Sequence, residues 1–168
     1  MTEHAPSHMK LRAARPEDSR KIWEWRNEQS AREASFNTSV IPYADHERWF
    51  SQRLNDPKSR MFIVVNSSGR DVGYVRFDIV RDSAEISMSI DKDERLRGIG
   101  AQAIQTASNH LLVTESLREI MARIMCNNAA SMAAFKRAGF VFRNRSQYAG
   151  IDVSEMIYRR KPDAHSKR

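Results

Sequence analysis

Apolar and polar residues alternate over two neighbouring stretches in the middle of the chain, residues 72–80 and 84–91. A period of two is typical of a strand that buries one face. The apolar run at 60–65 ends at a turn of Asn, Ser and Gly residues and predicts a third strand. The segment Arg81-Asp82-Ser83 predicts a hairpin turn between the other two, so we expect three consecutive strands here.

Helical signals flank these strands. Pro16 with two acidic residues after it predicts a helix start. His46, Phe50 and Leu54 share one face at four-residue spacing after Pro42, which predicts another helix. The whole pattern is that of a mixed α/β domain. The expected order is strand 9–13, helix 16–27, short helix or turn 28–34, helix after Pro42, strands 60–65, 72–80 and 84–91, helix 101–112, strand 118–125, helix 128–138, and strands 140–143 and 148–158.

The composition limits the class of protein. The 168 residues fit one domain, which we expect to span 1–168 with residues 1–8 and 161–168 as loose ends. The single cysteine excludes an intrachain disulfide, no Cys/His cluster has zinc spacing, and no apolar run approaches the roughly 20 residues that cross a membrane. Without a secretory signal, we expect a cytoplasmic protein with no metal and no membrane partner.

The net charge of +7 suggests an acidic partner. Lys and Arg are scattered along the chain, and most have acidic neighbours. Nucleic-acid binders instead gather basic residues and aromatics on one element. We therefore expect a small anionic ligand and no nucleic acid. We also expect that the chain can form a homodimer.

The most informative segment is a loop between a predicted strand and a predicted helix, Arg95-Leu96-Arg97-Gly98-Ile99-Gly100-Ala101. Two glycines one residue apart permit positive φ and clear side chains from the inner lip of the turn. The unpaired amides of this turn and of the helix start, together with the helix dipole, form a site for an anion such as a diphosphate. Arg95 and Arg97 could add charge-assisted bonds. The Gly-Lys-Ser/Thr of nucleoside triphosphate loops and the third glycine of a dinucleotide fingerprint are both missing.

Two segments resemble motifs of one enzyme family. Arg95-x-x-Gly98-x-Gly100-Ala101 is similar to the acetyl-CoA pyrophosphate loop of the GNAT family of N-acetyltransferases, and Asn128-x-x-Ser131 followed by Gly139-Phe140 resembles a later helix of that family. The order of elements over residues 9–158 also matches. The resemblance implies a mostly antiparallel mixed sheet with splayed central strands, flanked by helices, and acetyl-CoA as cofactor. It implies coenzyme contacts from Met88, Ser89, Ile90, Arg95, Arg97, Gly98, Ile99, Gly100, Ala101, Gln102, Asn128, Ser131 and Phe135.

Two of these residues have structural alternatives. Asn128 is expected to touch the pantetheine arm or to cap its helix, and the two roles are compatible. Phe135 stands where many family members have a tyrosine as general acid, and its pattern favours a core position. Because a free thiol has a pKa near about 8.5 and leaves readily, the acid is either dispensable or supplied by Tyr148.

Glu85 lies on the polar face of the strand that enters the implied splay. Members of the family often have a carboxylate there that acts through water, which makes Glu85 the candidate general base. The alternative is a surface glutamate paired with Arg76 or Arg81.

The acceptor is expected to bind to the first helices, because the second half of the chain holds the coenzyme. The pattern over residues 23–66 resembles amino-sugar N-acetyltransferases of the pseudaminic-acid pathway, which act on a nucleotide-linked 4-amino-dideoxy sugar. This implies acceptor contacts from Arg26, Asn27, Phe36, Asn37 and His46. Arg26 would meet the diphosphate or form a structural ion pair with Glu24 or Asp45. The neighbouring aromatics would stack on the substrate or lie in the core, as we expect for at least one of Trp25, Trp49 and Phe50.

Three functions stay open. The first is acetyl-CoA-dependent N-acetylation of a small-molecule amine, in particular a nucleotide-linked amino sugar. The second is acetylation of a protein N-terminus, of the ribosomal-protein type. The third is a non-catalytic CoA-binding module, which the missing tyrosine at position 135 leaves open.

Overall fold

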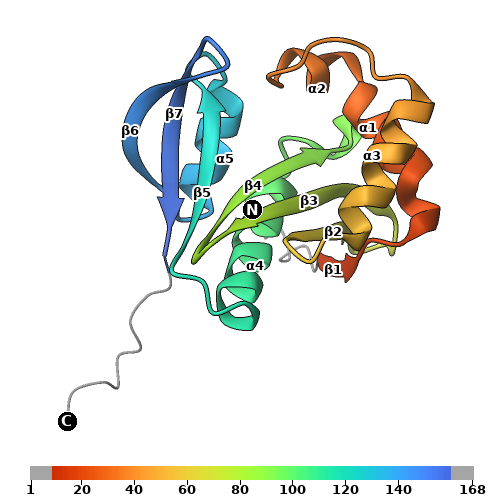
Figure 1. Cartoon of the computed structure of the whole chain (residues 1–168), viewed down its shortest axis with the longest axis horizontal. Helices are drawn as coiled ribbons and strands as arrows, with labels where there is room; N and C mark the ends of the chain where they lie inside the picture. Colours follow the sequence, from red (N-terminus) through yellow and green to blue (C-terminus); the bar gives the residue numbers. More distant parts are fainter. Residues whose placement is uncertain (1–8, 160–168) are drawn as a thin grey trace, which may run out of the picture.

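The computed structural model describes residues 9–159, so the loose ends expected at 1–8 and 161–168 lie outside the described residues. One seven-stranded sheet forms the centre, with the strand order β1-β2-β3-β4-β5-β7-β6 (Figure 1). Neighbouring strands are antiparallel except β4 and β5, which are parallel. The strands are β1 (Lys10–Ala13), β2 (Ser59–Val65), β3 (Asp71–Val80), β4 (Ser83–Ile90), β5 (Glu119–Met125), β6 (Val141–Tyr148) and β7 (Ile151–Tyr158).

Helices cover both faces of the sheet. On one face lie α1 and α3, with the short α2 reaching over the end of β4; on the other face lie α4 and α5 (Figure 1). The helices are α1 (Ser19–Asn27), α2 (Gln29–Glu33), α3 (Tyr43–Asn55), α4 (Ile99–Thr114) and α5 (Ala129–Arg137), with 3-10 turns η1 (Pro16–Asp18) and η2 (Lys92–Glu94). Within residues 9–159, no helix combines the length and the apolar character that crossing a membrane requires.

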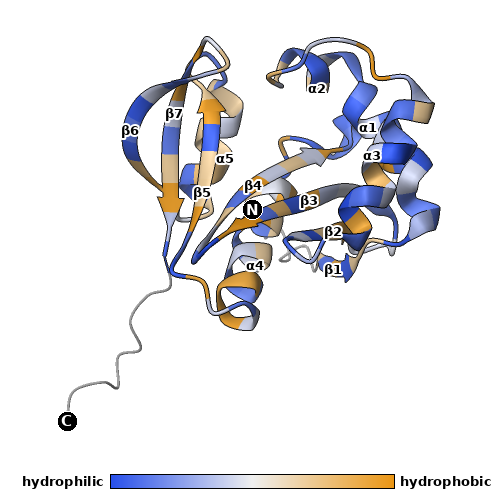
Figure 2. Cartoon of the chain, in the orientation of Figure 1, coloured by the Kyte–Doolittle hydropathy of each residue, from blue (hydrophilic) through white to orange (hydrophobic). Residues whose placement is uncertain are grey.

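The core consists of two apolar clusters, one on each face of the sheet. The larger packs α4 and α5 against β2–β5 and β7, and includes Phe77, Ile104 and Phe140. The smaller packs Trp25 of α1 and Phe50 of α3 against β2 and β3, so two of the three aromatics weighed above lie in the core. In Figure 2 the apolar positions lie along the strands and on the helix sides that face them.

The outer face of β3, which its polar residues mark as exposed, is in fact covered. Tyr74 is only 6% exposed and belongs to the smaller cluster. The helices α1 and α3 pack over this face, so β3 is buried on both sides at its centre. Arg76 and Asp78 follow on the same face, because alternate residues of a strand point the same way.

The two central strands splay apart, as the resemblance implies. β4 and β5 pair over only three residues, Ser83 to Glu85 against Glu119 to Met121. Beyond Glu85, β4 continues along β3 to Ile90 while β5 continues along β7 to Met125. The gap between the two halves is visible in Figure 1. From residue 86 onward, β4 therefore has an edge that no described strand covers.

Several element boundaries differ from the expectation, and two of the differences have a clear local cause. The helix expected at 101–112 begins at Ile99, because Gly98 adopts a left-handed conformation with φ of 79° and serves as its N-cap. The last two strands form a tight hairpin closed by Ala149 and Gly150, both with positive φ, as two-residue turns require. Nearly all of β6 is exposed, so its side chains do not alternate and the period of two is missing there.

Candidate functional site

The start of α4 presents several backbone amides without helical partners. Ile99, Gly100 and Ala101 form the first turn, and the N–H groups of a first turn have no acceptor within their own helix. Within residues 9–159 no side chain caps this turn. The N–H of Gln102 already donates to the Gly98 carbonyl at 3.2 Å, so the expectation that its amide also binds an anion is corrected: the candidate site ends at Ala101.

The amides at the start of α4 lie beside the open edge of β4. A Cβ built on Gly100 would lie 3.6 Å from Met88 and 3.7 Å from Ile90. In a strand paired on one side, alternate residues direct N–H and C=O groups away from the partner. The structure thus brings the two predicted coenzyme-binding segments together: an anion site at the helix start and a free strand edge next to it.

The two arginines of the loop lie elsewhere than expected. Arg95 donates to the Ile90 carbonyl at 2.9 Å and binds Glu28 at 2.9 Å and Ser30. It therefore ties the loop to the start of α2, and its guanidinium is not held for an anion. Next to it, Leu96 has a φ of 62° and is 99% exposed. Positive φ at a residue with a side chain is uncommon and concentrates at functional loops.

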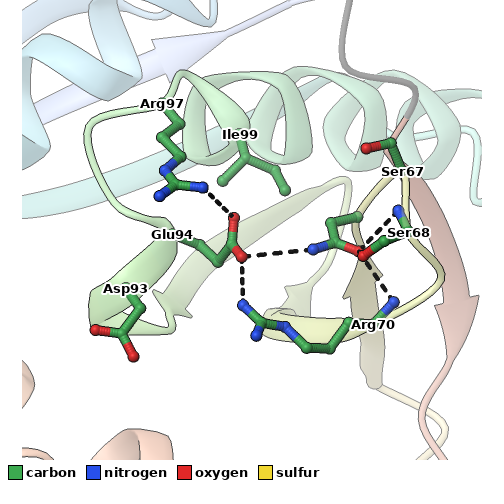
Figure 3. A pocket seen from close by; sticks show the side chains of 8 residues that line it. Ser67, Ser68, Arg70, Asp93, Glu94, Arg97 and Ile99 are labelled. Carbon is green, nitrogen blue, oxygen red and sulfur yellow. Dashed lines mark hydrogen bonds and ion pairs between the residues drawn. The ribbon is translucent and has the colours of Figure 1, made fainter.

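Arg97 borders a cavity of about 570 Å³ beside the start of α4 (Figure 3). At its centre lies the buried carboxylate of Glu94, which Arg70 binds directly and Arg97 approaches at 3.7 Å. The Arg97 side chain is exposed and therefore accessible to a ligand, whereas the charge of Glu94 is already balanced by Arg70. The cavity is lined by Asn66, Ser67, Ser68, Arg70, Asp93, Glu94, Arg97 and Ile99.

The later motif has a structural role in this structure. The side chain of Asn128 accepts a hydrogen bond from the Ser131 N–H at 3.0 Å and caps α5. This is one of the two roles expected for Asn128. Phe135 is 4% exposed and packs edge-on against Phe140 at 5.0 Å. The expected coenzyme contact of Phe135 is therefore corrected, because its ring is enclosed in the core.

Glu85 lies at the last paired position before the strands part. Its carboxylate binds Arg123 of β5 at 2.7 Å, and not Arg76 or Arg81 as the structural alternative had it. Burial raises the pKa of Glu85 above its usual range, while the charge of Arg123 opposes the rise and that of Asp78, its cross-strand partner, adds to it. A partly buried carboxylate with a raised pKa, at the point where two strands part, is a candidate proton acceptor.

Tyr148 and Phe36 meet above Arg123. The Tyr148 ring lies 4.8 Å from the Arg123 guanidinium and 4.8 Å from the Phe36 ring. Phe36 belongs to the segment after α2, and Tyr148 ends β6. Side chains from both halves of the molecule thus connect across the open end of the sheet, and Tyr148, at 42% exposure, is open to a bound molecule.

Of the other residues expected to bind the acceptor, two are used inside the fold. Asn27 bonds the backbone of Ile41 twice, at 2.8 and 2.9 Å, and so holds the loop before α3. His46 is fully buried and bonds the Ser19 carbonyl at 2.9 Å. Their expected contact with an acceptor is corrected, since neither side chain is available for one. Asn37 is exposed and accepts the N–H of Ser39, which shapes its own loop.

His46 and Arg26 interact on the same face. The Arg26 guanidinium contacts His46 Nδ1 at 3.3 Å and stacks on Trp49 at 4.0 Å. Because arginine only donates, Nδ1 is the acceptor and the Nε2–H donates to Ser19. His46 is therefore neutral; burial, reinforced by the charge of Arg26, lowers its pKa to about 4.

This arrangement predicts a loss of stability at mildly acidic pH. In the unfolded chain His46 is protonated near its ordinary pKa of about 6.5, whereas in the folded protein its pKa is about 4. Between these values the unfolded state binds more protons, so the free energy of unfolding falls as the pH falls, by at most about 3 kcal/mol from this group. Denaturant unfolding at pH 7.5 and at pH 5 measures this difference in the free energy of unfolding.

The variant His46→Gln should no longer lose this stability between pH 7.5 and 5. The control variant is His110→Gln, because His110 lies on the exposed side of α4, and it should lose stability as the wild type does. Carboxylates such as Asp18, whose pKa lies below its ordinary value, act only at lower pH. An unchanged pH dependence in His46→Gln would contradict the assignment.

The sequence analysis missed Arg123 and Asp78. Arg123 is the one charged residue within the otherwise apolar run from Ile120 to Met125, and an isolated charge in such a run is the signal that could have revealed it. Within residues 9–159, no three His, Cys, Asp or Glu side chains gather as a metal site would require.

The fold and the site are those of an acyltransferase. The chain belongs to the acetyltransferase (GNAT) domain family, whose model matches residues 8–141, and it is an acetyltransferase of that family. A curated relative is the L-methionine sulfoximine/L-methionine sulfone acetyltransferase of Pseudomonas aeruginosa, 24% identical over 123 residues, which are 70% of each chain.

Solved structures with the same fold include two acetyltransferases. Spermidine N-acetyltransferase from Vibrio cholerae, in complex with CoA and spermine, has a TM-score of 0.80 at 19% identity and covers 90% of this chain and 95% of its own. Aminoglycoside acetyltransferase AAC(6′)-Ib, in complex with coenzyme A and kanamycin, has a TM-score of 0.78 at 15% identity and covers 90% and 95%. At such identities the likeness is one of fold.

Proposed function

We propose that this chain transfers the acetyl group of acetyl-CoA directly to a primary amine of a small molecule. The observation that carries the proposal is the free edge of β4 beside the uncapped start of α4. The first turn of α4 supplies N–H groups and a positive dipole end for paired phosphates. The edge of β4 supplies strand-like hydrogen bonds for an extended amide-bearing arm. The two features lie next to one another, since Gly100 packs against Met88 and Ile90.

The remaining groups match the chemistry of amide formation. Bound acetyl-CoA supplies a thioester carbonyl as the acyl donor. An alkyl ammonium with a pKa near about 10.4 must lose a proton before it attacks, and Glu85 is the group placed to accept it, directly or through water. The backbone N–H of Ser89 or Ile90 was expected to polarise the carbonyl; the register turns the Ser89 backbone toward β3 and that of Ile90 toward the open edge, so we propose the N–H of Ile90 for this role. Tyr148 is the hydroxyl available to protonate the leaving thiolate.

The nucleotide-linked amino sugar stays a prediction for the acceptor. Three of the residues that the resemblance implied, Arg26, Phe36 and Asn37, are accessible enough to contact it. The relative that acts on methionine sulfoximine supports a compact amine as a second class of acceptor. A protein N-terminus is the third, and the assay below separates all three.

The proposal is tested by adding acetyl-CoA to the whole chain. At about 100 times its dissociation constant, a ligand stabilises the folded state by about 2.7 kcal/mol, which corresponds to a rise in Tm of about 5–10 °C for a domain of this size. Thiol release is then followed with a UDP-linked 4-amino sugar, with amino acids and amino sugars, and with peptides. If saturating acetyl-CoA produces no thermal shift, or if no acceptor class releases the thiol, the proposal is refuted.

A further inference from the structure

We infer that the acceptor carries an anionic group, a carboxylate or a phosphate, near its amine and that Arg26 binds this group. The inference rests on the proposed transfer reaction and narrows its acceptor class. It starts from an imbalance of charge on the sheet face that carries Glu85.

Arg26 differs from Arg76 and Arg123, the arginines whose charges act on Glu85, because it has no carboxylate partner in the described part of the chain. Arg123 is paired with Glu85 at 2.7 Å, and Arg76 with Asp78 at 3.1 Å. Within residues 9–159, Arg26 forms no ion pair with a carboxylate: its contacts are the neutral His46 and the ring of Trp49. A cation that is partly removed from water without a counter-charge is costly, and an anionic ligand would supply that charge.

The expected structural ion pairs of Arg26 do not form. Asp45 binds Arg48 instead, at 3.3 Å, and Glu24 makes no ion pair in the described part of the chain. The guanidinium groups of Arg26 and Arg76 both lie against the Trp49 ring, 4.0 and 5.2 Å from its centroid. Burial lowers the pKa of Arg26; Tyr74 opposes this shift and the charge of Arg76 adds to it. Positive charge gathered around one ring favours an anionic ligand there.

Arg26 also has donors to spare. A guanidinium carries five N–H groups, and the single contact with His46 uses one nitrogen. The buried polar atoms that lack a partner in residues 9–159 include Arg76 Nε but no nitrogen of Arg26, so its unused donors reach solvent. Stacking on Trp49 fixes the plane of the group, which lowers the entropy lost when it binds a carboxylate or phosphate.

Arg26 lies at the end of α1, beside β4. The end of α1 lies against β4, because the Ser89 hydroxyl contacts the Trp25 carbonyl at 3.5 Å. Arg26 follows Trp25 directly, and Glu85 lies further along β4 on the same face. A small acceptor that binds Arg26 through an anionic group therefore places its amine along β4, on the face that carries Glu85. An α-amino acid and an amino-sugar phosphate are two such acceptors. A polyamine would be repelled.

The experiment measures kcat/KM for matched acceptor pairs at saturating acetyl-CoA. One pair is L-methionine sulfone and its carboxamide; the other is glucosamine 6-phosphate and glucosamine. We expect at least one anionic member to be preferred by about 10-fold or more, the usual effect of one charged hydrogen bond. The carboxamide has the less basic amine, so a preference for the carboxylate cannot come from amine basicity. The two pairs separate carboxylate from phosphate as the source of charge.

Substitutions at Arg26 test whether this residue causes the preference for anionic acceptors. Arg26→Gln should lower kcat/KM for the preferred anionic acceptor about 10-fold or more and leave that of its neutral partner nearly unchanged, and Arg26→Lys should restore part of the loss. Arg20→Gln is the matched control, because Arg20 on the same helix stacks on Tyr43 at 4.0 Å in the same way. It should keep the preference.

The inference is overturned if neutral or polycationic amines are preferred, or if Arg26→Gln lowers both members of a pair equally. The thermal shift with acetyl-CoA reports separately on the proposed function. If that shift is present and the preference for anions is absent, only the inference about Arg26 fails; if the shift is absent, the proposed function itself fails.

Discussion

Gly98→Glu is expected to weaken acetyl-CoA binding by at least about 100-fold, the loss of roughly two charge-assisted hydrogen bonds. Gly98 caps α4 with a φ of 79°, and no atom lies within 4 Å of a Cβ built on it. A glutamate side chain would therefore extend into the open space in front of the helix start. Its carboxylate would occupy the positive end of the helix dipole and repel the phosphates.

Binding is measured by calorimetry and by the acetyl-CoA-dependent rise in Tm. The matched control is Gly69→Glu, since Gly69 has a φ of 81°, equally open surroundings and a place in the β2–β3 turn. Both variants carry the same backbone penalty, so both should lose similar stability without ligand. Only Gly98→Glu should lose the thermal shift, and wild-type affinity in that variant would exclude the α4 start as the phosphate site.

Glu85→Gln is expected to lower kcat by about 100- to 1,000-fold, the usual contribution of a positioned general base. The amide has nearly the same shape but cannot accept the proton of an ammonium. Because Glu85 lies at the base of the splay and away from the start of α4, acetyl-CoA should raise the Tm of this variant as in the wild type. Steady-state kinetics and thermal unfolding measure the two effects on the same preparation.

The control for lost ion pairing is Glu115→Gln. Glu115 binds Arg60 at 2.7 Å with a similar partial exposure, which matches the pair of Glu85 and Arg123, but it lies at the far end of α4. This variant should retain wild-type turnover. If kcat is unchanged in Glu85→Gln, Glu85 is not the general base and its role is the ion pair with Arg123.

The pH dependence of kcat gives a second readout. The wild type should lose activity as the pH falls through the raised pKa of Glu85, whose charged neighbours are Arg123 on β5 and Asp78 and Arg76 on β3. In Glu85→Gln this acidic limb should disappear, since no carboxylate is left to protonate. Other limbs of the profile should persist.

Local sequence patterns predicted most of the fold correctly. The alternation over 72–80 and 84–91 corresponds to β3 and β4, and the loop before residue 101 indeed places an uncapped helix start beside β4. These features depend on periodicity and on glycine at positive φ, both of which are local. The exposed strand β6 has no such period, and its boundaries were predicted less well.

The partners of charged residues could not be predicted from local patterns. Arg95 binds Glu28 and Ser30, residues more than 60 positions away, and Glu85 binds Arg123 across the splay. Such contacts depend on how helices and strands pack in three dimensions. His46 illustrates the same limit, because only the packing of α1 against α3 buries it and makes it structural.

The most direct test of the account is amide hydrogen exchange of the whole chain with and without CoA, read residue by residue by NMR. We predict that added CoA slows exchange, or shifts the amide resonances, at residues 98–101 and along residues 87–90, while β1 stays unchanged. If CoA instead perturbs other segments and leaves the start of α4 and the free edge of β4 as they were, the coenzyme does not bind in the splay and the account is contradicted.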